Sequence, residues 1–178
     1  MTSNPRLPAF PAEKLRALYA LWSSRLDGQA LPLRSSFRPE EFQPWMGNLL
    51  IVGVEGCPRR FRLRLVGTEI VYYDGADYTG RFLDEVLKPP VARVVLRQFE
   101  DCAVRGKAMA FRYRSASFRG VEAGIDKLFL PFTQDGRTVS QIFACLYASF
   151  ADPHARERPT IQDYELDGAT VTFDPAEL

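Results

Sequence analysis

The spacing of hydrophobic and polar residues changes several times along the chain, and each change marks a predicted helix or strand. Apolar residues recur at helical spacing over residues 11–26, and Asp27-Gly28 offers a stop. Two prolines predict an extended connector over residues 31–39. The N-terminal part is therefore predicted to be a flexible stretch at 1–10 and an amphipathic helix within 11–30.

The period then changes to that of β-strands. Residues 49–54 are a continuous apolar run, typical of a strand covered on both faces, and residues 60–65 alternate strictly between apolar residues and arginine. Because Gly56-Cys57-Pro58 lies between them, an antiparallel hairpin is predicted. Further strands are predicted at 109–115, 125–132 and 138–149.

A segment rich in glycine and aromatic residues, 67–88, separates the hairpin from the later strands. It predicts short helical pieces, and a longer helix follows from Pro90 to Gly106. The element order predicts one α+β domain over 31–150, with a five-stranded antiparallel sheet and short helices on one face. In the tail, 151–178, residues 161–173 predict a small hairpin.

Composition narrows the possible functions. The chain has 178 residues, a formal net charge of +1, three Cys and one His. Nucleic-acid binders that neutralise phosphates carry a far larger basic surplus. Widely spaced cysteines and a lone histidine indicate neither a disulfide framework nor a metal site. Without a membrane span or a secretory signal, the chain is predicted to be cytoplasmic.

Two charged groups are candidates for chemistry or binding. Asp74 and Asp77 either act as paired carboxylates or shape an Asp-Gly turn. Arg60, Arg62 and Arg64 share one face of the hairpin. They form either a surface for an acidic partner or a solvated face with acidic neighbours.

Aromatic residues gather where helices would cover the sheet, and they form either core or a ligand pocket. The hydroxyl of Thr68 and the tyrosine hydroxyls would orient a ligand. The predicted pocket residues are Thr68, Tyr72, Tyr78, Phe82, Phe111 and Phe143.

Four stretches carry a family resemblance: Leu31-Pro-Leu-Arg-Ser-Ser-Phe-Arg-Pro, Phe61-Arg-Leu-Arg-Leu-Val-Gly-Thr68, Asp77-Tyr-Thr-Gly-Arg-Phe-Leu-Asp84 and Leu128-Phe-Leu-Pro-Phe132. Together they resemble the PAS domain superfamily and, more narrowly, a family of small, mostly single-domain bacterial PAS-like proteins. The resemblance covers about residues 12–150. It implies a five-stranded sheet used for sensing or protein contact and rarely for catalysis. It also implies that an N-terminal helix mediates dimerisation.

Cofactor-bearing relatives match poorly. Flavin photosensors of this superfamily need a cysteine in an Asn-Cys-Arg motif, and haem-binding members usually supply a histidine from the long helix. The crossover segment has no such motif, and residues 90–105 contain no histidine. No cofactor is therefore predicted.

The leading hypothesis is a non-catalytic regulatory protein that binds a small apolar or amphipathic ligand, a partner protein, or both. Two alternatives come from other classes. One is a cone-shaped α+β isomerase with Asp126 as the general base in an aromatic cavity. The other is a pure interaction adaptor that uses the arginine face.

Overall fold

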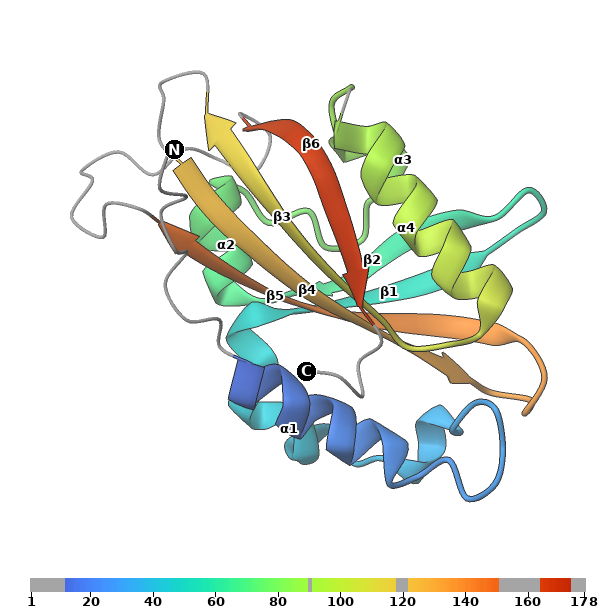
Figure 1. Cartoon of the computed structure of the whole chain (residues 1–178). Helices are drawn as coiled ribbons and strands as arrows, with labels where there is room; N and C mark the ends of the chain where they lie inside the picture. Colours follow the sequence, from blue (N-terminus) through green and yellow to red (C-terminus); the bar gives the residue numbers. More distant parts are fainter. Residues whose placement is uncertain (1–11, 90, 118–121, 151–163, 174–178) are drawn as a thin grey trace.

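The computed structural model describes residues 12–89, 91–117, 122–150 and 164–173. Its centre is one antiparallel sheet with the strand order β2-β1-β5-β4-β3-β6 (Figure 1). The five predicted strands are confirmed, and the predicted hairpin is formed by β1 and β2. Their bounds are Leu49–Glu55 for β1, Arg60–Val66 for β2, Met109–Ser117 for β3, Glu122–Thr133 for β4 and Val139–Phe150 for β5.

The sixth strand corrects one prediction. Residues 161–173 were expected to form a small hairpin, but Tyr164–Phe173 is a single strand, β6, paired antiparallel with β3 along the sheet edge. The pairing shifts register where Arg112 and Arg114 face Val171 and Asp167, close to the Asp167-Gly168 pair that suggested a turn. Because β3 has an edge that can pair with another strand, the chain forms a bulge near this glycine and does not reverse its direction there.

Helices cover both faces of the sheet (Figure 1). The crossover helices α2 (Thr68–Asp74), α3 (Leu83–Val86) and α4 (Val91–Arg105) cover one face, as predicted. The opposite face is covered by α1 (Ala12–Ser23), which lies within the predicted N-terminal helix, and by the 3-10 helix η2 (Pro39–Asn48), which begins where the predicted connector ends. A short 3-10 turn, η1, occupies Arg34–Ser36.

The alternation of side chains along the strands produces two separate hydrophobic clusters. On β5, Phe143 and Cys145 face α1, whereas Ala144 and Leu146 face the crossover helices. This alternation is the expected consequence of a strand whose successive side chains point to opposite faces. Because both faces are covered, β5 is apolar at nearly every position, as a strand buried on both sides must be.

Hydrogen bonds anchor the N-terminal helix to the sheet and to η2. The indole Nε1 of Trp22 donates to the carbonyl of Pro131 at 2.9 Å, and that of Trp45 donates to the carbonyl of Lys14 at 2.8 Å. The apolar face of α1, which includes Leu15 and Leu18, is buried within the chain. Within the described residues, no helix is long and apolar enough to cross a membrane.

Candidate functional site

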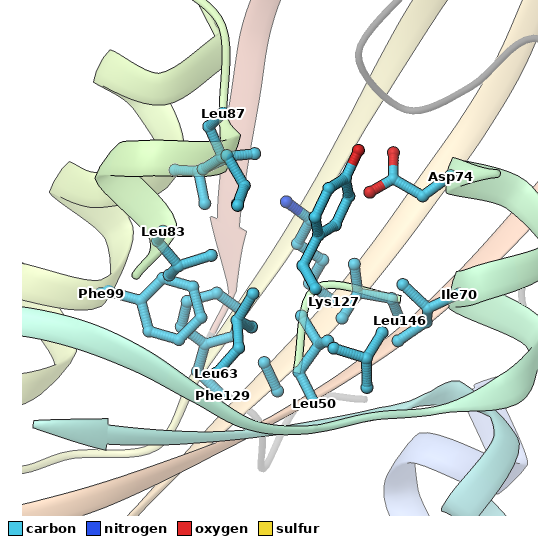
Figure 2. A pocket seen from close by; sticks show the side chains of 15 residues that line it. Leu50, Leu63, Ile70, Asp74, Leu83, Leu87, Phe99, Lys127, Phe129 and Leu146 are labelled. Atoms are coloured by element: carbon cyan, nitrogen blue, oxygen red, sulfur yellow. The ribbon is translucent and has the colours of Figure 1, made fainter. Parts of the chain in front are cut away.

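A cavity of about 60 Å³ lies between the sheet and the crossover helices (Figure 2). Its walls come from β1, β2, β4 and β5 on the sheet side and from α2, α3 and α4 on the other. All but three of its lining residues are apolar. They are Leu50, Leu63, Val66, Ile70, Asp74, Tyr78, Leu83, Val86, Leu87, Val95, Phe99, Lys127, Phe129, Ala144 and Leu146.

A glycine sets the position of α2 beside this cavity. A Cβ added at Gly67, which precedes α2, would collide with the backbone carbonyls of Met46 and Gly47 in η2. Only glycine allows the two backbones to approach this closely. At its other end α2 stops at Gly75, whose φ of 75° is left-handed, so the chain turns after Asp74.

Lys127 is the charged residue that reaches the cavity from the sheet. It lies on β4, it is only 4% exposed, and it points toward the crossover helices together with Phe129, its neighbour on the same face. Burial removes the water that would solvate an ammonium group, and this lowers the pKa of Lys127 from 10.5 to about 7. Close to neutral pH the side chain therefore exists in both charged and neutral forms.

Asp74 and Tyr78 supply the other polar groups. Figure 2 shows the carboxylate of Asp74 directed toward the cavity, at the same end as the nitrogen of Lys127. Asp77, by contrast, accepts hydrogen bonds from the backbone N–H and the hydroxyl of Thr79 at 2.9 and 2.7 Å. The two aspartates thus have different roles: Asp77 shapes the turn, and Asp74 lines the cavity.

The six predicted pocket residues do not form one site. Tyr78 lines the cavity. Thr68 and Tyr72 lie on exposed positions of α2, with Tyr72 63% exposed. The aromatic periodicity of the crossover segment did not reveal which side of this short helix faces the sheet.

The three phenylalanines lie in three different places. Phe111 belongs to the hydrophobic cluster on the cavity face, next to Phe129, but does not line the cavity itself. Phe143 lies on the opposite face, in the cluster under α1. Phe82 lies below the guanidinium groups of Arg60 and Arg62, whose central carbons are 3.7 and 4.0 Å from its ring centroid.

Sequence reasoning missed Lys127 and left two roles open for Asp74, a turn or a paired carboxylate. A usable signal existed for the lysine: it occupies an alternate position with Ile125 and Phe129 in the nearly apolar run 125–132. Strand periodicity places these three side chains on one face. A lysine there must lie against the same helices as its apolar neighbours.

The arginine face is compensated by acidic residues of the same chain. Arg60 contacts Asp84 at 2.9 Å and Glu85 at 3.0 Å. Arg62 and Arg64 both pair with Glu55. These contacts match the solvated-face interpretation, and because the pairs are exposed to solvent they contribute little to stability.

A second hollow, of about 420 Å³, lies on the surface beside Arg60. Here Arg59 is paired with Glu100, at 3.0 Å. Its floor is apolar, and its rim carries three arginines and two carboxylates. The lining residues are Arg59, Arg60, Phe61, Asp84, Leu96, Arg97 and Glu100.

Asp126, the base of the isomerase alternative, does not line the cavity. As the neighbour of Lys127 on β4 it points to the opposite face of the sheet, where the Arg112 guanidinium donates to its carboxylate at 2.9 Å. Burial raises the pKa of Asp126 to about 6, although the arginine opposes that shift. The aromatic cavity therefore lacks the carboxylate that this mechanism assigned to it.

The two buried cysteines offer little nucleophilic chemistry. Burial raises the pKa of both Cys102 and Cys145 to about 12, so these thiols stay protonated at neutral pH. Within the described ranges, no group of three or more His, Cys, Asp or Glu side chains could hold a metal ion.

Most of the chain matches a known protein family. The sequence profile of a family described as PAS domain matches residues 11–147. That span includes α1, the five predicted strands up to Tyr147, and every residue that lines the cavity. No curated protein matches the chain.

Proposed function

Because this chain belongs to the PAS domain family of sensory modules, we propose that it senses a small, largely apolar ligand held in the cavity beside Lys127. The observation that carries this proposal is the cavity itself. Ligand sites are typically apolar hollows with a few convergent polar groups. Here three polar side chains, Asp74, Tyr78 and Lys127, join an otherwise apolar lining.

The size of the cavity limits the ligand. At about 60 Å³ it holds the equivalent of a few water molecules and is far smaller than the ~300 Å³ at which drug-sized sites begin. The occupant is therefore a compact molecule of a few non-hydrogen atoms. A larger ligand would require α3, which has only four residues, to move away from the sheet.

Ligand binding would act by shifting the population of two packings of the crossover segment. A contiguous route links the cavity to α1. Helix α2, which carries Ile70 and Asp74, begins at Gly67 against η2, and η2 holds α1 through the Trp45–Lys14 hydrogen bond. The signal would leave through the exposed side of α1 to a partner signalling protein or a second copy of the chain.

Sensing requires no turnover of the ligand, so we propose a non-catalytic protein. We also propose that it acts in the cytoplasm. The homodimer that the resemblance implies would have to use the exposed side of α1, because Leu15, Leu18 and Trp22 are buried against their own sheet. Light scattering during gel filtration measures that oligomeric state directly.

Thermal denaturation with a library of small apolar compounds tests the ligand proposal. A ligand present at 100 times its Kd stabilises the folded state by about 2.7 kcal/mol, which raises the Tm of a domain of this size by roughly 5–10 °C. Leu146→Phe, which fills the cavity, should abolish the shift. A compound that shifts the wild type and this variant equally binds elsewhere, and that result would overturn the proposal.

The signalling route has its own test. Trp45→Phe removes the hydrogen bond to α1 but leaves the cavity lining intact. Ligand should slow amide hydrogen exchange in residues 12–23 of the wild type and not of this variant, while Tm still rises in both. Unchanged exchange in the wild-type helix would exclude α1 as the output.

An adaptor role is the second candidate, and the surface hollow beside Arg60 favours it. Arg97, on the exposed side of α4, lines this hollow and forms no ion pair with the described residues. An acidic partner should be lost from Arg97→Glu and retained by Arg105→Glu, an exposed control on the same helix. Retention by both variants would exclude this surface.

A further inference from the structure

We propose that Lys127 binds its ligand covalently, as an imine, and that the ligand is a small apolar aldehyde or ketone. This inference rests on the proposed function, because it names the chemical class that the cavity would take. Three features of the site support it: a buried amine in a largely apolar cavity, a carboxylate and a phenol that line the same cavity, and the charge that these groups impose on a ligand.

Among the described residues that line the cavity, Lys127 supplies the amine, and most of the others are apolar. Lys127 extends from β4, a central strand, into the space below α2, α3 and α4 (Figure 2). Its place on a hydrogen-bonded strand between β3 and β5 fixes the backbone. The amine is thereby presented to any molecule that enters the cavity.

The same burial makes the amine reactive. A lysine attacks a carbonyl only in its neutral form, and an apolar pocket favours that form. The lowered pKa of Lys127, about 7, leaves a large neutral fraction at physiological pH. The other lysines of the chain, Lys14, Lys88 and Lys107, all lie on exposed positions.

Asp74 and Tyr78 complete the requirements for imine formation. The nitrogen of Lys127 would attack the carbonyl carbon, and the carbonyl oxygen would take a proton from the Tyr78 hydroxyl. The Asp74 carboxylate would accept a proton from nitrogen and return it to the departing hydroxyl, while the phenol regains its proton from the nitrogen. One C–N double bond forms and one water molecule leaves, with no redox change.

The charges in the cavity argue against an anionic ligand. A carboxylate would add a second negative charge beside Asp74 in a site of low polarity, where like charges repel strongly. A neutral carbonyl compound avoids this repulsion, and the neutral imine that it forms adds no charge beside the carboxylate. The titratable groups that line the cavity with Lys127 are Asp74 and Tyr78.

Reductive alkylation of the full chain tests the proposal. The protein is treated with propanal and cyanoborohydride at pH 7, and the propylated lysines are located by peptide mass spectrometry. Lys127 should be modified at least about tenfold faster than Lys14, Lys88 or Lys107, because Lys127 lines the cavity that would hold the aldehyde and the other three lie on exposed positions. Glyoxylate, an anionic aldehyde, should modify it at least about tenfold more slowly than propanal.

Two variants control for entry and for site. Leu146→Phe keeps the amine but fills the cavity, so fast labelling should be lost while the slow labelling of exposed lysines continues. Lys127→Met should lose the fast adduct and keep the fold, because its side chain is of similar length and apolar. Near-ultraviolet circular dichroism verifies folding of both.

The outcome separates this inference from the proposed function. If Lys127 in the wild type is labelled no faster than the exposed lysines, the imine is excluded, even where non-carbonyl compounds still raise Tm through the cavity. If no compound of any class acts through the cavity and propanal is equally inert toward Lys127, both proposals fail.

Discussion

The two faces of the sheet are built from the same strands but are filled differently. Under α1, aromatic rings interlock: Phe42 and Phe132 both contact Phe143, with ring centroids 4.9 and 4.5 Å apart. Under the crossover helices, the rings of Phe99 and Phe129 also contact each other, with centroids 4.4 Å apart, but a cavity remains beside them. The first face holds the fold together, and the second combines stability with space for a ligand.

One dipeptide shows the difference at the level of single residues. Asp126 and Lys127 are adjacent on β4 and both are buried, yet they point to opposite faces. Asp126 forms an ion pair with Arg112 at the edge of the packed face. Lys127 lies within the cavity lining. Burying a charged side chain costs free energy in both cases. The site that keeps a lysine in a mainly apolar lining is therefore the stronger candidate for function.

The largest effect should come from truncating the packed face. Phe143→Ala removes a fully buried ring and should lower the free energy of unfolding by about 3–5 kcal/mol. Ligand selection should not change, because Phe143 faces α1. Phe129→Ala, its counterpart on the cavity face, should cost a similar amount but admit larger ligands. Urea denaturation and the compound library measure the two effects, and equal ligand selection in both variants would contradict the division of roles.

The next effect is the pH dependence of stability, which should have opposite signs for the buried charged groups on the two faces. The pKa of Lys127 is lowered from 10.5 to about 7 on folding, so the unfolded chain binds more protons between these values. Stability should therefore rise with pH from about 7 to 10.5, and Lys127→Met should remove that rise. At pH 7 this variant should be more stable than the wild type, because it removes the cost of burying the amine.

Asp126 provides the reverse case. Its pKa is raised from 3.8 to about 6, so the folded chain binds more protons in that interval and its contribution to stability falls as the pH rises through it. Asp126→Asn should flatten that part of the urea-denaturation profile. A profile that neither variant changes would mean that these two groups are not perturbed by burial.

Two matched Leu→Phe substitutions should change stability least and should distinguish the two faces most sharply. Leu130→Phe, on the packed face, should destabilise the protein by roughly 1–3 kcal/mol, because Leu130 is fully buried within the cluster under α1. Leu146→Phe places the same addition next to the cavity and should cost less than about 1 kcal/mol. Equal costs would show that the cavity is not available space.

The sequence predicted the strands, the hairpin and the crossover helices because each has a local pattern. It did not predict which face each helix covers. Strand periodicity places Phe143 and Ala144 on opposite faces, but both faces are apolar, so nothing local shows which lies under α1. The same uncertainty explains why the pocket expected from aromatic residues included Phe143, although the sheet lies between Phe143 and Tyr78.

The site was harder to predict because its polar groups come from distant segments. Asp74 ends α2 and Lys127 lies in the middle of β4. Their meeting depends on the turn at Gly75 and on the close approach at Gly67, which is a tertiary contact. Tyr72 was assigned to the pocket, and the role of Asp74 was left open, because the rotation of a helix as short as α2 is fixed by packing and not by its own sequence.

The central claim is that the space beside Lys127 binds a small apolar ligand, and NMR spectroscopy tests it most directly. Amide and methyl shifts are followed while propanal, or a non-carbonyl compound of similar size, is added. The account predicts saturable changes centred on Ile70, Leu87 and Leu146, which line the cavity, and none at Leu18, Leu130 or Phe143 on the packed face. Changes spread over both faces, or confined to the surface, would contradict it.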